Sequence, residues 1–118
     1  MESPAPAPSW RCAAGALEPG RTATFQLMCG GRVVSGFIVN HDGRHHAYVN
    51  RCPHAGTPLD WWPNEFLTED GRHLICATHG AVFASDTGTC VEGPCPGARL
   101  QTLAVAREGE SLVVTCPE

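Results

Sequence analysis

The sequence predicts an all-β fold, a small antiparallel sandwich or barrel. Short apolar or alternating segments recur along the chain, and Gly, Pro and Asp residues separate them. No stretch keeps the 3.6-residue period of a helix for more than two turns. The 118 residues are 42% hydrophobic and 17% charged, which is typical of one globular domain.

The first half of the chain contains three expected strands. Residues 1–9 are rich in Pro and Ala and predict a flexible tail. Polar and apolar residues alternate over 22–27, the pattern of a half-buried strand. The β-branched run 32–40 is long enough for a central strand, and an Asp42-Gly43 turn reverses the chain into a strand over 45–50.

The second half begins with an irregular, Pro-rich segment over residues 51–70. Segments of this length without secondary structure are usually functional in a compact domain. Shorter strands are expected afterwards at 73–75, 100–107 and 112–116, with turns at Asp86-Thr87-Gly88 and Glu108-Gly109-Glu110. Chemistry is therefore expected near the irregular segment.

Charge and composition exclude several classes of function. Twelve acidic residues and eight Arg, with no Lys, give a net charge of −4, which argues against nucleic-acid or anionic-membrane binding. No apolar run approaches the ~20 residues of a membrane span, and the N-terminus lacks the pattern of a secretory signal. We therefore expect a cytoplasmic protein, in whose reducing surroundings clustered Cys and His residues bind metal more often than they form disulfides.

Two short clusters combine Cys with His. Cys52 and His54 follow the strand expected to end at Asn50, and Cys76 and His79 follow the strand 73–75. Neighbouring strand positions face opposite ways, so each pair can turn toward one site only from a loop. The Gly and Pro residues of both segments suit such loops.

Two Cys and two His ligands allow two kinds of metal site. One is a tetrahedral structural zinc site. The other is a [2Fe–2S] cluster with two Cys on one iron and two His on the other. Zinc fingers usually pair like ligands, whereas each segment here mixes them, which favours the cluster. Four unrelated residues in a Cys-rich chain are the remaining alternative.

The two segments resemble the signature of the Rieske-type [2Fe–2S] family, C-x-H followed by C-x-x-H. Cys52, His54, Cys76 and His79 match it residue by residue, with 21 residues between the two pairs, somewhat more than in typical ferredoxins. The resemblance implies a Rieske domain over 10–118, an antiparallel sandwich or incomplete barrel with a small cluster-binding subdomain. Its cluster-binding loops would span about 51–60 and 75–84, and a shielding Gly-Pro loop about 90–97.

The resemblance also implies a function. A cluster with four protein ligands has no open position, so its simplest use is one-electron transfer. We expect a soluble ferredoxin that accepts an electron from an NAD(P)H-dependent flavin reductase and passes it to an oxygenase, with no nucleic-acid or membrane partner. The chain is too short for the oxygenase catalytic domain, so we do not expect an enzyme in its own right. A redox subunit or sensor that is not a carrier, or a zinc-stabilised interaction module, are the alternatives.

By the same resemblance, the site lacks the features of high-potential members. Thr57 and Thr78 stand where those members have a disulfide between the loops, and Ala81 and Phe83 stand where they have Ser and Tyr hydroxyls. Each missing dipole destabilises the reduced, more negative cluster. The resemblance therefore implies a potential toward the low end of the Rieske range.

The remaining Cys, His and Trp residues receive structural interpretations. Cys12, Cys29 and Cys116 are expected to be small hydrophobic residues of the core. Plain packing is also favoured for Cys90 and Cys95, although a disulfide between them remains an alternative. The hairpin histidines are expected to face solvent rather than bind a second metal; they are His41, His45 and His46. Trp61 and Trp62, in the longer spacer up to Gly71, suit either the core edge or a docking patch.

Overall fold

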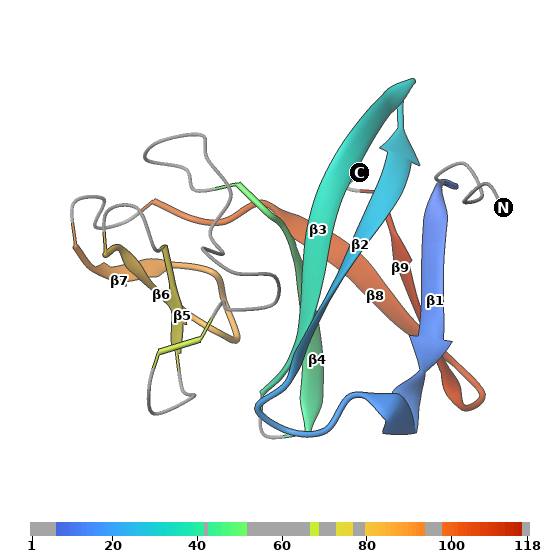
Figure 1. The fold of residues 1–118 in the computed structure, drawn as a ribbon, viewed down its shortest axis with the longest axis horizontal. Coiled ribbons are helices and arrows are strands. Elements are labelled where there is room, and N and C mark those ends of the chain that lie inside the picture. Colours follow the sequence, from blue (N-terminus) through green and yellow to red (C-terminus); the bar gives the residue numbers. More distant parts are fainter. Residues whose placement is uncertain are drawn as a thin grey trace, which may run out of the picture.

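The protein consists of two antiparallel sheets. The computed structural model describes residues 7–41, 43–51, 67–68, 73–76, 80–93 and 98–116. The larger sheet has the strand order β1-β9-β8-β4-β3-β2, and the smaller has the order β5-β6-β7. In Figure 1 the small sheet lies on one side of β3 and β4, and β1 and β9 lie on the other. The expected all-β fold is confirmed.

The strands of the larger sheet have the following bounds: β1 Ser9–Ala13, β2 Thr22–Cys29, β3 Arg32–His41, β4 Arg44–Val49, β8 Thr102–Glu108 and β9 Ser111–Thr115. The small sheet contains β5 His73–Ile75, β6 Val82–Ala84 and β7 Cys90–Glu92. A short 3-10 helix, Ala14–Ala16, follows β1. Among these described elements, no helix has the length and apolar character needed to cross a membrane.

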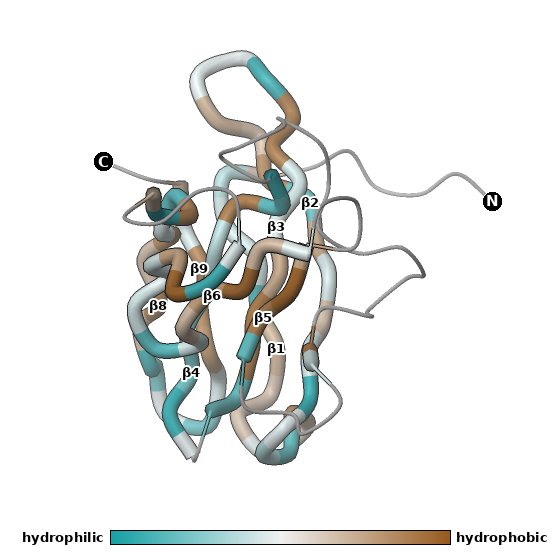
Figure 2. Tube along the Cα trace, turned by 90° about the vertical axis from the view of Figure 1, so that its left-hand side faces the viewer, coloured by the Kyte–Doolittle hydropathy of each residue, from teal (hydrophilic) through white to brown (hydrophobic). Residues whose placement is uncertain are grey.

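Two hydrophobic cores lie on opposite faces of β3 and β4. Ile38 and Ala47 pack in the core inside the larger sheet, with Leu27 and Val114. Phe37, Val39 and Tyr48 pack in a second core, and its remaining members come mostly from the small sheet and its connections: Leu74, Cys76, Ala81, Phe83, Cys90 and Leu100. In Figure 2 the tube is brown along β5, whereas turns at the lower end of the molecule are white or teal. Residues 36–40 of β3 are buried, and because both faces of this part are covered, the apolar residues Phe37, Ile38 and Val39 follow one another without a polar residue between them.

The larger sheet closes into an incomplete barrel because its two end strands, β1 and β2, approach each other. The Met28 N–H donates a hydrogen bond to the Ala7 carbonyl (2.9 Å), and the Trp10 ring stacks on Phe25 with centroids 4.7 Å apart. A disulfide joins Cys29 to Cys116 across the same seam. The prediction that these two cysteines simply fill the core is therefore wrong, because the ends of β2 and β9 meet although they lie 87 residues apart in sequence.

One buried asparagine fixes the β3–β4 turn. Asn40 is 5% exposed; its Nδ2 donates to the Leu17 carbonyl and its Oδ1 accepts from the Gly43 N–H, both at 2.8 Å. The backbone of Gly43 has φ +88, a left-handed conformation that glycine adopts without strain. The Asn40 amide therefore ties the turn to the segment that leads into β2.

Tyr48 connects the barrel to the small sheet. Its hydroxyl donates a 2.8 Å hydrogen bond to the carbonyl of Ser85, in the turn after β6. A Cβ added to Gly88 would lie 2.8 Å from the Tyr48 ring, so the ring is tightly enclosed. Burial, together with the Asp86 carboxylate, raises the pKa of Tyr48 to about 12, so the phenol stays protonated and able to donate at neutral pH.

We therefore expect Tyr48→Phe to lower the free energy of unfolding by about 1–2 kcal/mol, because the buried hydrogen bond from the Tyr48 hydroxyl to the Ser85 carbonyl is lost. Urea unfolding of the variant and wild type measures this difference. The control is Thr102→Val, at an exposed position of β8. We expect this control variant to unfold with nearly the free energy of wild type. Equal stability of Tyr48→Phe and wild type would contradict it.

Candidate metal centre

Cys76 is the one predicted metal ligand that lies within the described residues. It follows β5 directly, is fully buried, and packs in the second core with Leu74 and Phe83. Cys52, His54 and His79 lie outside the described residues. The proposed ligand set therefore remains a prediction from sequence. The structure describes the backbone directly before Cys52 and on both sides of residues 77–79.

The segment from Cys76 to Ala81 is closed into a tight loop by two backbone hydrogen bonds. The Cys76 N–H donates to the Ala81 carbonyl, and the Gly80 N–H donates to the Cys76 carbonyl, each at 2.8 Å. Gly80 has φ +70, which allows the chain to turn back into β6. These two bonds fix the two ends of the segment, Cys76 on one side and Gly80 and Ala81 on the other.

Gly93, directly after β7, packs against this loop. A Cβ at Gly93 would lie 2.8 Å from the Ala81 Cα and 3.2 Å from the Gly80 carbonyl oxygen. Its φ of +103 is also a conformation that L side chains rarely adopt. No larger residue fits here unless the backbone of the loop moves. The end of β7 therefore limits where the loop can lie.

The first predicted loop begins from a fixed strand end. The Asn50 N–H donates to the Ser35 carbonyl at 2.9 Å and the Arg51 N–H to the Val49 carbonyl at 2.8 Å. The first bond continues the pairing with β3 as far as Asn50, and the second fixes the backbone of Arg51, the residue before Cys52. The sequence places the Cys–His pair immediately after this anchored end.

The donor chemistry at Cys76 fits an iron or zinc ligand. Its thiol lies in an apolar cluster without exposure to water, and a thiolate in such surroundings needs a compensating positive charge. Ala81 and Phe83, whose side chains carry no hydroxyl, are also fully buried in this core. Within the described residues, no group of three or more His, Cys, Asp or Glu residues could hold a metal ion.

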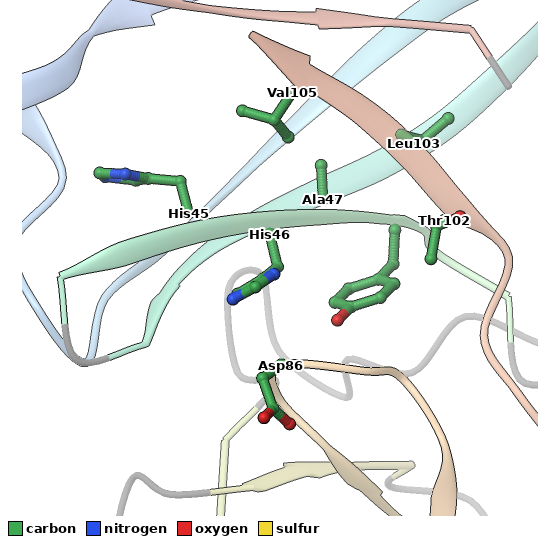
Figure 3. A pocket seen from close by; sticks show the side chains of 8 residues that line it. His45, His46, Ala47, Asp86, Thr102, Leu103 and Val105 are labelled. Carbon is green, nitrogen blue, oxygen red and sulfur yellow. The ribbon is translucent and has the colours of Figure 1, made fainter. Parts of the chain in front are cut away.

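The hairpin histidines do not lie as expected. His45 and His46 are half-buried rather than facing solvent, and their Nε2 atoms are shielded from water with no hydrogen-bond partner among the described residues. They leave β4 on opposite faces: His46 points toward Asp86, and His45 points to the side of Val105 (Figure 3). Both line a cavity of about 230 Å³. The prediction was wrong because Asp86, in the turn after β6, lies on the side of His46, and Val105 of β8 lies on the side of His45.

Burial lowers the pKa of His46. The Asp86 carboxylate opposes this shift, whereas the positive charges of His41, Arg44 and His45 add to it. A depressed folded-state pKa means that the unfolded chain binds a proton more readily. The contribution of His46 to the free energy of unfolding is therefore fully present above the ordinary histidine pKa of about 6.5. It is lost as the pH drops below that value.

We expect His46→Gln to reduce this acid sensitivity. The measurement is the urea midpoint of the variant and wild type at pH values of about 7.5 and 5.5, on either side of the histidine pKa. The difference between the two pH values should be smaller in the variant, because the group that takes up the extra proton on unfolding is gone. An unchanged difference would contradict the assignment to His46.

The comparisons with known proteins decide the family. The sequence profile of the Rieske [2Fe-2S] domain matches residues 9–116. The chain belongs to the Rieske [2Fe–2S] domain family. The cofactor of this domain family is a [2Fe–2S] cluster.

One relative of this Rieske chain is a ferredoxin component of a monooxygenase system. The ferredoxin component of the alkene monooxygenase system of Xanthobacter autotrophicus is 43% identical over 51 residues, which cover 43% of this chain and 38% of that protein. The chain thus matches less than two-fifths of this curated relative's length.

Solved structures agree on the Rieske fold. The ferredoxin of carbazole 1,9a-dioxygenase from Nocardioides aromaticivorans superposes with a TM-score of 0.68 at 22% identity, covering 91% of this chain and 94% of that one. The terminal oxygenase of carbazole 1,9a-dioxygenase from a Novosphingobium species gives 0.70 at 20% identity, covering 93% of this chain and 30% of that one. Both likenesses show the fold, an incomplete barrel with a small second sheet.

Proposed function

We propose that this protein is a one-electron carrier that binds its [2Fe–2S] cluster through Cys52 and Cys76 on one iron and His54 and His79 on the other. The observation that carries the proposal is the buried Cys76 in a loop closed by two hydrogen bonds, within a chain that belongs to the Rieske family. When bound, the cluster supplies reversible one-electron chemistry. Because all four protein ligands would be engaged, no iron position is left for a substrate.

The protein's own residues would exclude water and hold the ligands in place. Phe83 and Leu74 belong to the same buried apolar core as Cys76, and an apolar core lowers the dielectric around a ligand. Gly93 packs against Gly80 and Ala81 and so limits where the end of the second predicted loop can lie. This packing keeps the ligand geometry similar in both redox states, as rapid electron transfer needs.

The proposed partners are an NAD(P)H-dependent flavin reductase and an oxygenase. The relative in the alkene monooxygenase system and the ferredoxin of carbazole 1,9a-dioxygenase support this choice. Between Cys52 and Gly93 the sequence has six acidic residues and one arginine, so the cluster-binding part would attract a basic partner face. Val91, 55% exposed in β7, would add an apolar contact. Because NAD(P)H is an intracellular donor, we place the carrier in the cytoplasm.

The test is reconstitution of the full chain with iron and sulfide under anaerobic conditions. We expect a brown protein whose dithionite-reduced form gives an EPR signal with a lower average g value than clusters held only by thiolates. The protein should relay electrons from a flavin reductase to cytochrome c, and added salt should slow transfer to a basic partner. A colourless preparation that binds zinc but no iron would contradict the proposal.

The midpoint potential provides a separate prediction. We expect a value on the order of −150 mV, because Ala81 and Phe83 bring no hydroxyl dipoles to the cluster. Loss of protons from the two imidazole ligands favours the oxidised state, so the potential should fall as the pH rises through their pKa values. A redox titration that returns a midpoint well above zero would contradict the low-potential assignment.

A further inference from the structure

The disulfide between Cys29 and Cys116 crosses the seam of the barrel. Cys29 is the last residue of β2 and Cys116 directly follows β9, with their Cα atoms 5.7 Å apart. β2 is one end strand of the sheet, and β9 pairs with the other end strand, β1. Both cysteines are half-buried rather than enclosed in the core. The bond is therefore at the periphery, on the line where the sheet is not closed by a strand ladder.

The seam has contacts that do not depend on this bond. The hydrogen bond from the Met28 N–H to the Ala7 carbonyl and the stacking of Trp10 on Phe25 both join β2 to the β1 side. The Cys116 Sγ also lies 3.4 Å from the Met28 carbonyl oxygen and 3.7 Å from that of Pro8. A reduced Cys116 thiol would thus find acceptors in place, so the barrel accommodates the dithiol form.

The strand register also favours thiol exchange at Cys29. Arg32 lies directly opposite Cys29 in the β2–β3 pairing and is exposed. A neighbouring guanidinium stabilises a thiolate, and a more stable thiolate is a better leaving group in disulfide exchange. Cys29 is therefore the expected leaving thiolate of the bond.

We propose that Cys29 and Cys116 form a reversible redox site that exchanges with protein dithiols of the thioredoxin class and fastens or releases the barrel seam. One reductant thiolate attacks Cys116 Sγ and expels the Cys29 thiolate, and the second reductant thiol then resolves the mixed disulfide. Two electrons and two protons pass from the dithiol to the protein, and the reductant becomes a disulfide. The cytoplasmic setting, where such dithiols are abundant, rests on the proposed function.

The first test measures the thiols of the native, cluster-loaded protein. Reduced thioredoxin is added, thiols are alkylated, and peptides are identified by mass spectrometry. We expect thioredoxin to make Cys29 and Cys116 available for alkylation together. Both should resist alkylation again when oxidised glutathione is added after the reduction. Labelling of both without reductant, or resistance to thioredoxin until the protein is denatured, would each overturn the proposal. The absorbance of the cluster is recorded in parallel, so that failure of cluster binding is seen separately.

The second test measures the melting temperature with and without thioredoxin. Reduction removes a covalent link that closes a loop of more than 80 residues, so we expect a drop on the order of 10 °C. The double variant Cys29→Ser/Cys116→Ser should melt at the lower temperature under both conditions. Cys12→Ser, which removes a half-buried thiol of β1 that forms no disulfide, should respond like wild type. A wild-type melting temperature that thioredoxin does not change would overturn the proposal.

Discussion

Replacing Cys76 by alanine is expected to abolish binding of the [2Fe–2S] cluster while the barrel stays folded. The substitution removes one of the two proposed thiolates, and no other ligand can occupy this fully buried position after β5. Alanine adds no polar atom to the apolar core around Leu74 and Phe83, so the loss reports on ligation rather than on a buried hydroxyl. The measurements are iron and sulfide content and visible absorption, with the NMR signal of the Trp10 indole as a marker of the barrel.

Cys12→Ala is the matched control for this variant. Cys12 lies in β1 and packs against the other core, and burial raises the pKa of its thiol, so it stays protonated at neutral pH. We expect this variant to keep full iron content. Wild-type iron content in Cys76→Ala would contradict the proposed ligand set.

Replacing Gly93 by alanine has the second-largest expected effect. The new Cβ would lie 2.8 Å from the Ala81 Cα, which is backbone and cannot swing aside, and the φ of +103 adds strain. The loop from Cys76 to Ala81 has to shift. We expect a loss of about 2–4 kcal/mol in the free energy of unfolding and a lower yield of bound iron, measured by urea unfolding and iron analysis.

Gly109→Ala is the control that separates the effect of backbone strain from the effect of displacing the segment from Cys76 to Ala81. Gly109 also has a positive φ, +62, but a Cβ added there would meet no atom within 4 Å. This variant should lose only about 1–2 kcal/mol from backbone strain and should bind iron fully. Equal iron content in the two variants would show that Gly93 does not position the loop.

The strands that follow clear patterns were predictable. The run 32–40 became β3, which is buried over residues 36–40, and residues 73–75 became β5. The short strands β6 and β7 were not anticipated, because three residues carry too little pattern to distinguish a strand from a turn. The disulfide could not be found either, since nothing near Cys29 in the sequence indicates that it meets Cys116.

The predictable part of the site was its local sequence motif. The position of Cys76 directly after a short strand was predicted and is confirmed, whereas its role as a ligand stays a prediction. The contact of Gly93 with Ala81 depends on how β7 pairs with β6, where the register shifts at Val82 and Phe83. The half-burial of His46 likewise depends on a distant turn at Asp86. Such long-range contacts leave no signal in the local sequence.

The two-sided burial of β3 limits how this protein can change its length. Successive residues Phe37, Ile38 and Val39 alternate between the two cores. A single inserted or deleted codon within the strand would send each following side chain to the wrong core, whereas a substitution disturbs only one position. Relatives should therefore differ in length at the connections around the small sheet and keep the strand itself constant, which makes those connections the natural sites for grafting new recognition loops.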